Sequence, residues 1–287
     1  MPKLKMYRGL PGSGKTTHAR AEVVAYGNCG RINRDDLRAM LFDSVWTGRR
    51  EGVVVECEKA IAKVLMANQM VALVDDTNLT PRHKELWAAL AKEQGIAFEI
   101  VDCGQPLAEC IRRDTFRGAK SVGEAVINRL ALNAGLIDFG DKPIVVVDVD
   151  GTVANGEHRE HLVRGEKKNW GAYYARLNRD TPIQPIIDRV NGLAETHTIL
   201  IVSGRPDTYQ RETLAWLRGV AKIKFDYFFQ RAGNDKREDS IIKKEILDKL
   251  PKEKIVLVLD DRPRVCRMWE SEGLNVEWVR GRDCEEF

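Results

Sequence analysis

Two aspartates, Asp148 and Asp150, directly follow the apolar run 144–147 near the middle of the chain. Side chains two positions apart on an extended strand point to the same side, so both carboxylates face one site. Carboxylate oxygens are ligands that Mg²⁺ accepts, whereas an unpaired carboxylate inside a core is costly. The spacing predicts a magnesium site at the end of a buried strand, with the Thr152 hydroxyl added after a sharp turn at Gly151.

A second motif that could bind a ligand lies near the start of the chain. Residues 9–16 read Gly-Leu-Pro-Gly-Ser-Gly-Lys-Thr between a short strand and a helix, the context of a phosphate-binding loop. Glycines let successive backbone N–H groups surround phosphates at a helix N-terminus. Lys15 is expected to reach the β- and γ-phosphates and Thr16 to hold Mg²⁺, so ATP or GTP is the predicted ligand. The residues expected to bind this nucleotide are Gly12, Ser13, Gly14, Lys15, Thr16 and Thr17.

Charged residues after the loop have two interpretations. Asp35 and Arg38 lie three apart on a helix that Asn33 can cap. The carboxylate could take a proton from an attacking hydroxyl, with the arginine gripping a substrate phosphate. Capping and an i,i+3 ion pair explain the same spacing equally well, so the residues alone leave both open.

Two helical arginines, Arg113 and Arg117, lie four apart near the end of a helix at 107–117. Arginines there could close over the nucleotide as a lid and stabilise charge on the transferred phosphoryl group. Solvated charges at a helix end are the alternative, which the residues alone favour.

Later strands end in further polar groups. An apolar strand at 70–74 is followed by Asp-Asp-Thr-Asn, the position where an acidic residue supports Mg²⁺ or a substrate hydroxyl. The strand at 198–202 ends in Ser203, Gly204 and Arg205, and the strand at 255–259 ends in Asp260 and Asp261. Because strand ends of an open α/β sheet share one edge, these groups should meet, and converging carboxylates require a divalent cation.

Strands alternate with helices throughout the chain, which predicts an α/β protein of two domains, each a mostly parallel sheet with flanking helices. The segment 140–143, Gly-Asp-Lys-Pro, is the expected linker. The boundaries are therefore about 1–140 and 143–287.

The composition bounds the class of protein. The 287 residues suit two globular domains, with 43% hydrophobic and 31% charged residues. No apolar run approaches the roughly 20 residues that span a bilayer, and no signal-peptide pattern opens the chain. Six cysteines without a Cys-x-x-Cys pair predict reduced thiols in the cytoplasm. A net charge of +3 does not by itself establish a nucleic-acid partner.

The motifs together carry a family resemblance. Asp-x-Asp-Gly-Thr after a hydrophobic strand resembles the haloacid-dehalogenase-type phosphatases, whose first aspartate is the nucleophile. The series GLPGSGKT, INRDDLR, DDTN, RRDTFRGAK and DVDGT resembles the phage polynucleotide 5′-kinase/3′-phosphatases over nearly the whole chain. This resemblance implies a P-loop kinase at 1–140 and a dehalogenase-like Rossmannoid phosphatase at 143–287, with a small cap at about 154–182.

The resemblance also implies roles in the kinase half. Asp35 becomes the general base for a 5′-hydroxyl, and Arg38 holds the neighbouring 3′-phosphate. Arg117, with Arg113, becomes the lid arginine on the donor phosphates. The matching triplet Asp76, Thr77 and Asn78 is assigned to substrate binding.

In the phosphatase half, the resemblance makes Asp148 the nucleophile and Asp150 the acid that becomes the base. One lysine must neutralise the nucleophile; spacing from Arg237 indicates Lys249, and Lys243 stays an alternative. The expected magnesium ligands are Asp148, Asp150, Asp260 and Asp261, with Thr16 in the kinase half. The expected substrate contacts are Thr152, Ser203, Gly204, Arg205 and Arg237.

The presumed cap combines aromatic and basic residues. Trp170, Tyr173 and Tyr174 lie among basic residues, so they either stack bases or form the core of the cap. His158 and His161 are expected to be surface residues, not metal ligands. The basic residues in question are Arg159, Arg164, Lys167 and Lys168.

The resulting hypothesis is a bifunctional nucleic-acid end-healing enzyme that uses ATP and Mg²⁺. It phosphorylates 5′-hydroxyl ends and removes 3′-phosphate or 2′,3′-cyclic phosphate ends, and RNA in the cytoplasm of a phage-infected cell is the favoured substrate. Its products are the ends that a ligase joins. Two alternatives are a small-molecule or nucleoside kinase fused to a nucleotide phosphatase, and a binding scaffold with decayed sites. Preference between RNA and DNA, and assembly as a homo-oligomer, stay open.

Overall fold

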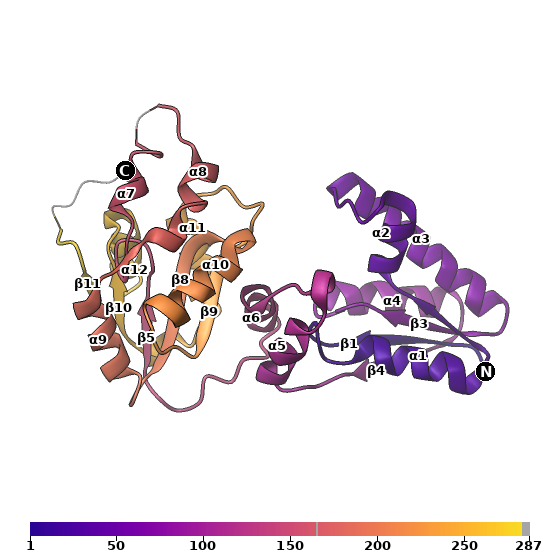
Figure 1. The fold of residues 1–287 in the computed structure, drawn as a ribbon. Helices are drawn as coiled ribbons and strands as arrows, with labels where there is room; N and C mark the ends of the chain where they lie inside the picture. Colours follow the sequence, from indigo (N-terminus) through magenta and orange to yellow (C-terminus); the bar gives the residue numbers. More distant parts are fainter. Residues whose placement is uncertain (165, 283–287) are drawn as a thin grey trace. The chain divides into compact units, whose positions relative to one another are not determined.

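The computed structural model describes residues 1–164 and 166–282 (Figure 1). Packing divides the chain into two compact units, Met1–Ser121 and Val122–Phe287. The described cysteines are free thiols, as expected, whereas Cys284 lies outside the described residues. None of the described helices is both long and apolar enough to cross a membrane.

The first unit is built on a four-stranded parallel sheet. Its central strands pair Leu4 with Ala72 and Tyr7 with Asp75, which brings the start of the phosphate loop beside the acidic end of the next strand. In sheet order the strands are β2 (Cys29–Ile32), β3 (Val71–Asp75), β1 (Lys3–Arg8) and β4 (Ala97–Asp102).

Helices cover both faces of this sheet. Trp87 and Met66 pack with Leu4 and Met6 on one face, and Ala19 packs with Leu73 on the other. Asn33, Thr47 and Thr80 each cap a helix by accepting from a backbone N–H, so the expected Asn33 cap is confirmed. The helices are α1 (Lys15–Tyr26), α2 (Arg34–Phe42), α3 (Gly48–Ala67), α4 (Pro81–Glu93) and α5 (Leu107–Thr115), with a 3₁₀ turn η1 (Gly118–Lys120).

The second unit contains a five-stranded parallel sheet with β5 at its centre. Val145 and Val147 enter the core on one face and Ile144 and Val146 the core on the other, as expected for a strand buried on both sides. In sheet order the strands are β11 (Val276–Trp278), β10 (Ile255–Asp260), β5 (Ile144–Val147), β8 (Thr198–Pro206) and β9 (Tyr227–Arg231).

Helices flank this sheet as well. Ile187 of α9 and Trp216 pack on the face of Val145, whereas Ile242 of α11 and Trp269 of α12 pack on the opposite face. The elements are α6 (Glu124–Asn133), α9 (Gln184–Leu193), η3 (Asp207–Tyr209), α10 (Gln210–Ala215), the π-helical turn η4 (Trp216–Val220), α11 (Asp239–Leu247), η5 (Lys252–Lys254) and α12 (Pro263–Ser271).

The expected cap is a small insertion between β5 and β8. An antiparallel ladder that pairs Asn155 with Thr181 closes its base. Its elements are β6 (Ala154–Asn155), α7 (Glu157–Glu160), α8 (Trp170–Tyr174), η2 (Leu177–Arg179) and β7 (Thr181–Pro182).

The boundary between the compact units lies earlier than the expected linker at 140–143. Helix α6 packs with the second unit: Nδ2 of Asn128 donates to the carbonyl oxygen of Phe228 (3.2 Å), and Arg129 pairs with Asp207 (2.7 Å). Ala125 and Leu132 enter the cores of the second sheet. Local sequence shows that α6 is amphipathic but not which sheet receives its apolar face.

Candidate active sites

Glycines shape the phosphate loop between β1 and α1. Gly12 and Gly14 have φ values of 83° and 94°, in the left-handed region that other residues rarely adopt. A Cβ atom at Gly12 would also overlap the carbonyl oxygen of Cys110. The loop therefore requires glycine there, and its N–H groups at the start of α1 suit an anion.

Lys15 is buried at the first residue of α1. Its Nζ donates to the carbonyl oxygens of Gly9 (2.9 Å) and Leu10 (2.8 Å). Burial lowers the pKa of Lys15, whereas the charge of Asp75 raises it. An incoming phosphate would compete with these two carbonyls for the ammonium group.

The other residues expected at the nucleotide differ in exposure. Ser13 is buried, Thr17 is exposed, and Thr16 is half-buried close to the carboxylate of Asp75. Burial raises the pKa of Asp75, while Arg31 and Thr16 lower it. An acidic strand end thus adjoins the residue expected to hold Mg²⁺.

The triplet Asp76, Thr77 and Asn78 positions the loop. Nδ2 of Asn78 donates to the carbonyl oxygen of Tyr7 (2.8 Å), and the carbonyl oxygen of Thr77 accepts from the N–H of Gly9 (3.0 Å). Asn78 is buried, so the substrate contact expected for it is wrong: its side chain ties β1 to the turn after β3. Asp76 accepts from the backbone N–H of Arg34 (3.1 Å).

Asp35 and Arg38 form the expected ion pair at 2.6 Å, and Asp35 is exposed. The Arg38 guanidinium also donates to both carboxylate oxygens of Glu51, at 3.0 and 2.8 Å. The sequence does not single out Glu51, because its partner lies in another helix. Glu51 therefore orients the Arg38 guanidinium. Asp35, the other carboxylate bound to Arg38, stays exposed at the surface.

Arg113 and Arg117 both lie near the phosphate loop. Burial lowers the pKa of Lys15, and the nearby charge of Arg117 lowers it further. Nη1 of Arg113 lies 3.8 Å from the position that a Cβ at Gly14 would occupy. Arg117 donates to Asp114 (3.0 Å). Both arginines therefore lie near the loop, and their role as a lid stays a prediction.

The first unit also contains a buried carboxyl group that no pattern in the sequence predicts. Glu58 of α3 is fully buried and accepts from Nε of Arg34 (2.7 Å). Burial, helped by Asp76, raises the pKa of Glu58 to about 9. The surroundings of Glu58 therefore favour its protonated form beside Asp76.

In the second unit, three buried carboxylates from two strand ends converge. Asp148, Asp260 and Asp261 offer oxygen atoms that all lie within 4.8 Å of one another. Burial raises the pKa of Asp148 well above its usual range. Burial and the charge of Asp260 raise the pKa of Asp261 to about 7. Such mutual repulsion among oxygen ligands fits a divalent cation.

The Asp261 carboxylate lies so close to the backbone after Asp150 that only glycine fits at position 151. Gly151 has φ +78°, and a Cβ there would overlap the Asp261 carboxylate. The sequence predicts a sharp turn at this position but not its neighbour.

Lys243 of α11 is the lysine of this site. Its Nζ lies 2.7 Å from Oδ1 of Asp148 and 2.7 Å from Oδ2 of Asp260. Burial alone would lower the pKa of Lys243, but the two aspartates hold it above its usual value. The preferred assignment, Lys249, is wrong: Lys249 is exposed beyond the end of α11, whereas Lys243 shares the buried face with Ile242.

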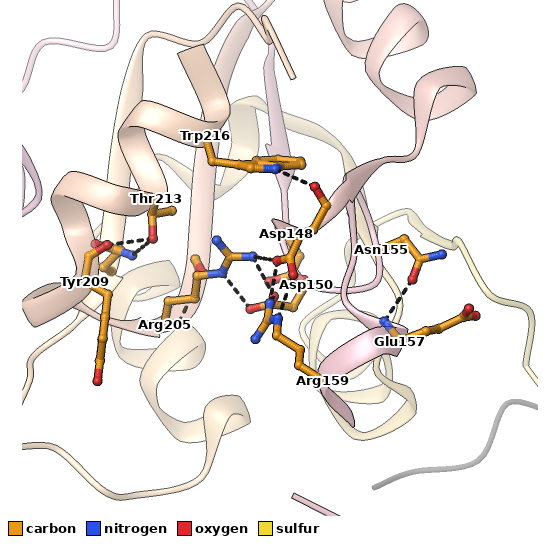
Figure 2. Close-up of polar contacts among 12 residues, drawn as sticks. Asp148, Asp150, Asn155, Glu157, Arg159, Arg205, Tyr209, Thr213 and Trp216 are labelled. Atoms are coloured by element: carbon orange, nitrogen blue, oxygen red, sulfur yellow. Dashed lines mark hydrogen bonds and ion pairs between the residues drawn. The ribbon is translucent and has the colours of Figure 1, made fainter. Parts of the chain in front are cut away.

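Asp150 is held by two arginines (Figure 2). Nε and Nη2 of Arg205 donate to it at 3.0 and 2.7 Å, and Nη2 of Arg159 donates at 2.6 Å. Burial opposes ionisation, but Arg205 and Arg159 hold the pKa of Asp150 well below its usual range. Its carboxylate lies outside the three-carboxylate group and against the two arginines, and its expected role as a metal ligand stays a prediction.

The same contacts correct the role expected for Arg205. This guanidinium is fully buried and also donates to Asp180 (2.7 Å), so it orients Asp150 instead of contacting a substrate phosphate. Arg159, expected only as a cation of the cap, is likewise buried and pairs with Asp180 (2.6 Å). Sequence spacing could not reveal this clamp because its members come from β8 and the cap.

The remaining predicted contacts lie at different depths. Ser203 is buried, and its Oγ accepts from the N–H of Arg205 (3.2 Å). Thr152 is fully buried, and its Oγ1 has no hydrogen-bond partner among the described residues. Gly204 lines the cavity, where a Cβ would overlap Asp239. Arg237 is at the rim and pairs with Asp235 and Glu245.

One cavity of about 1300 Å³ opens over this site. Its catalytic end includes Asp148, Lys243 and Asp260. Aromatic and basic side chains of the cap and of neighbouring loops form the remainder, including Lys167, Lys168, Trp170, Tyr174, Tyr209 and Lys236. A ligand whose phosphate group lies at the acidic end of the cavity would therefore extend past these aromatic rings.

Family models match both halves of the chain. Residues 142–283 match the model described as the polynucleotide kinase PNKP phosphatase domain, and residues 4–135 match an AAA domain. A putative bifunctional polynucleotide kinase/RNA ligase of Autographa californica nuclear polyhedrosis virus is 26% identical over 308 residues, covering 97% of this chain. This chain spans 42% of the length of that relative.

Solved structures are similar over the whole chain or one half. A chain of the Pnkp1/Rnl/Hen1 RNA repair complex shares 25% identity with a TM-score of 0.41, covering 96% of this chain and 95% of that one. The Mycobacterium tuberculosis APS kinase CysC, solved with AMPPNP and APS, shares 23% identity with a TM-score of 0.35, covering 48% of this chain and 76% of that one.

Proposed function

From the match of residues 142–283 to the polynucleotide-kinase phosphatase-domain family, joined to an AAA domain at 4–135, we propose that this chain heals polynucleotide ends. One unit phosphorylates a 5′-hydroxyl and the other removes a 3′-phosphate. The observation that carries the proposal is the convergence of Asp148, Lys243 and Asp260 within the phosphatase-family segment.

The kinase unit transfers the γ-phosphoryl group of ATP. Lys15 and the loop N–H groups bind the β- and γ-phosphates, and Thr16 with Asp75 supports Mg²⁺. Asp35 takes the proton of the 5′-hydroxyl as its oxygen attacks, and ADP leaves. Arg117 stabilises charge on the transferred group, and Arg38, oriented by Glu51, holds the neighbouring phosphate of the acceptor.

The phosphatase unit forms a covalent intermediate. A carboxylate oxygen of Asp148 attacks phosphorus, the bond from phosphorus to O3′ breaks, and Asp150 donates a proton to O3′. Asp150 then takes a proton from the water that hydrolyses the aspartyl-phosphate, releasing inorganic phosphate. The arginine clamp favours the ionised Asp150 that this second step needs.

Two cationic groups complete this site. Lys243 neutralises the attacking carboxylate and keeps Asp148 and Asp260 together. Mg²⁺ bound by Asp148, Asp260 and Asp261 would neutralise charge on the nucleophile and the phosphate. The three-carboxylate donor set suits this ion.

The ends produced, a 5′-phosphate and a 3′-hydroxyl, are those that a ligase joins. The viral relative named above is described as a putative bifunctional polynucleotide kinase/RNA ligase, which supports RNA ends and a functional link to a ligase. A cytoplasmic location, in a host cell if the chain is phage-encoded, belongs to the same proposal. A small-molecule kinase fused to a nucleotide phosphatase is not favoured by the family matches.

The decisive experiment uses one oligonucleotide with a 5′-hydroxyl and a 3′-phosphate, as matched RNA and DNA, with γ-labelled ATP and Mg²⁺. We expect label at the 5′ end and release of inorganic phosphate. Lys15→Ala should remove only the first reaction and Asp148→Asn only the second. Absence of either reaction in the unmodified protein would remove that half of the proposal.

A further inference from the structure

A row of aromatic rings runs along the phosphatase cavity. The ring of Trp170 stacks on that of Tyr174, with centroids 5.8 Å apart and an interplanar angle of 24°. Tyr174 in turn packs on Tyr209, with centroids 5.3 Å apart. All three line the cavity, and Trp170 is 42% exposed. The row thus ends in an indole with accessible surface, in the same cavity that the catalytic carboxylates line.

The alternative that these aromatics form the core of the cap holds fully for Tyr173, which is the only one of Trp170, Tyr173 and Tyr174 that is buried. Tyr173 is buried, and the guanidinium of Arg159 lies 4.0 Å from its ring centroid. Because Arg159 also binds Asp150, this contact fixes α8 to the catalytic clamp. Trp170 packs edge to face on Tyr173, with ring centroids 5.5 Å apart, yet 42% of Trp170 stays exposed, so part of its indole is free to contact a ligand.

Unneutralised cations lie beside the row. Arg237 and Arg231 of the same cavity are paired with carboxylates, Asp235 and Asp239 respectively. In contrast, the ion pairs of the described residues include none to Lys167, Lys168 or Lys236, although all three line the cavity. Nζ of Lys168 lies 5.9 Å from the Trp170 ring centroid. Positive charge is therefore available next to the exposed indole.

The size of the cavity is more than one terminal phosphate requires. Pockets for small ligands commonly measure about 300–1,000 Å³, whereas this cavity measures about 1300 Å³. Aromatic faces beside cations are the means by which proteins bind single strands, with bases on the rings and phosphodiesters on the cations.

We propose that Trp170 is a base-stacking platform that makes the phosphatase prefer the 3′-phosphate end of a single strand of two or more nucleotides. This inference rests on the proposed 3′-phosphatase activity and specifies its substrate. The 3′-phosphate lies at Asp148, a base stacks on the exposed face of Trp170, and Lys167 and Lys168 contact the next phosphodiester.

The kinetic test compares a single-stranded 3′-phosphorylated trinucleotide with p-nitrophenyl phosphate, which has no base to stack. In Trp170→Ala we expect KM for the trinucleotide to rise about ten-fold with little change in kcat, since stacking on one aromatic ring contributes about that factor. Trp170→Phe should recover most of the loss. The matched control is Trp46→Ala, because Trp46 is 57% exposed and lies in the other unit.

A salt series tests the lysines. Replacing Lys167 and Lys168 together by glutamine should lower the slope of log KM against log salt by about 0.7, since each neutralised single-strand phosphate contributes about 0.7. An unchanged slope would remove the phosphodiester contact from the inference.

Binding separates this inference from the proposed activity. The trinucleotide is titrated against Asp148→Asn with and without Trp170→Ala, which requires no turnover. A roughly ten-fold weaker affinity in the double variant supports the platform. Equal affinities, or an unmodified enzyme that binds a 3′-mononucleotide as tightly as the trinucleotide, would overturn it. Loss of phosphatase activity on every substrate, by contrast, would refute the proposed function and leave the binding result readable.

Discussion

The Nζ atom of Lys243 lies 2.7 Å from Oδ1 of Asp148, and the two side chains come from α11 and the end of β5. The same Nζ contacts Asp260 of β10. One buried cation thus holds two carboxylates that would otherwise repel each other. The contact also identifies which lysine neutralises the nucleophile, because the sequence left Lys243 and Lys249 as two candidates for that role.

Replacing Lys243 by glutamine should abolish most 3′-phosphatase activity and destabilise the second unit. We expect kcat to fall by about 10²–10³, the loss typical when a charge-stabilising group is removed. Unfolding should become easier by about 3 kcal/mol, because breaking a buried ion pair leaves charge unpaired. Phosphate release and thermal unfolding measure the two effects. Lys249→Gln is the matched control, and equal losses in both variants would contradict the assignment.

Arg159→Gln should change the pH dependence of the phosphatase. Arg205 and Arg159 hold the pKa of Asp150 below its usual range, so removal of one arginine raises it. Because Asp150 must be ionised to activate water, the rate should begin to fall at a higher pH as the solution is acidified. The measurement is kcat for p-nitrophenyl phosphate between pH 4 and pH 8, roughly the interval around an ordinary aspartate pKa. Superimposable profiles would exclude Asp150 as the titrating group.

Asp261→Asn should separate charge repulsion from metal binding. Without metal, burial and Asp260 raise the pKa of Asp261 to about 7, so its ionisation above that pH weakens the fold. The variant should therefore melt at a higher temperature than the unmodified protein in chelator at pH 8. Added Mg²⁺ should raise the melting temperature of the unmodified protein but raise that of the variant less.

Lys15→Ala is the control for that comparison, because its phosphatase carboxylates are intact and its response to Mg²⁺ in the second unit should remain. A full Mg²⁺ response in Asp261→Asn would show that this carboxylate is not a ligand.

Glu58→Gln should stabilise the first unit at alkaline pH. The pKa of Glu58 is about 9 in the fold, above its ordinary value, so the native state holds the proton more tightly than the unfolded chain. The resulting stability is fully present below the unfolded pKa and is lost as pH rises toward 9. At pH 8 the variant should melt about 4 °C higher than the unmodified protein, which corresponds to about 1 kcal/mol.

At pH 4 the melting temperatures of Glu58→Gln and the unmodified protein should converge, since Glu58 is then largely protonated in both states. Glu56→Gln, on the same helix with Glu56 exposed, should show neither effect. A lower melting temperature for Glu58→Gln at pH 8 would mean that Glu58 is ionised and paired with Arg34.

The sequence by itself determined the local features. The apolar run ahead of Asp148 predicts a strand buried on both faces, and the glycine spacing around Lys15 predicts the phosphate loop. Both predictions depend only on neighbouring residues. The glycines allow the backbone conformation of the loop, the run of apolar residues indicates a buried strand, and the first polar residue marks where that strand ends. Asp148 and Asp260 each follow an apolar strand, and the general rule that parallel strand ends share an edge is enough to bring them together.

Only the tertiary structure decided which charges pair across elements. It selected Lys243 over Lys249, gave Arg205 and Arg159 to Asp150, buried Asn78 against Tyr7, and packed α6 on the second sheet. Sequence spacing indicates which residues share a helix face, but the partner of that face depends on packing between segments far apart in the chain. Electrostatic roles follow from those partners, because burial and the nearest opposite charge set each pKa.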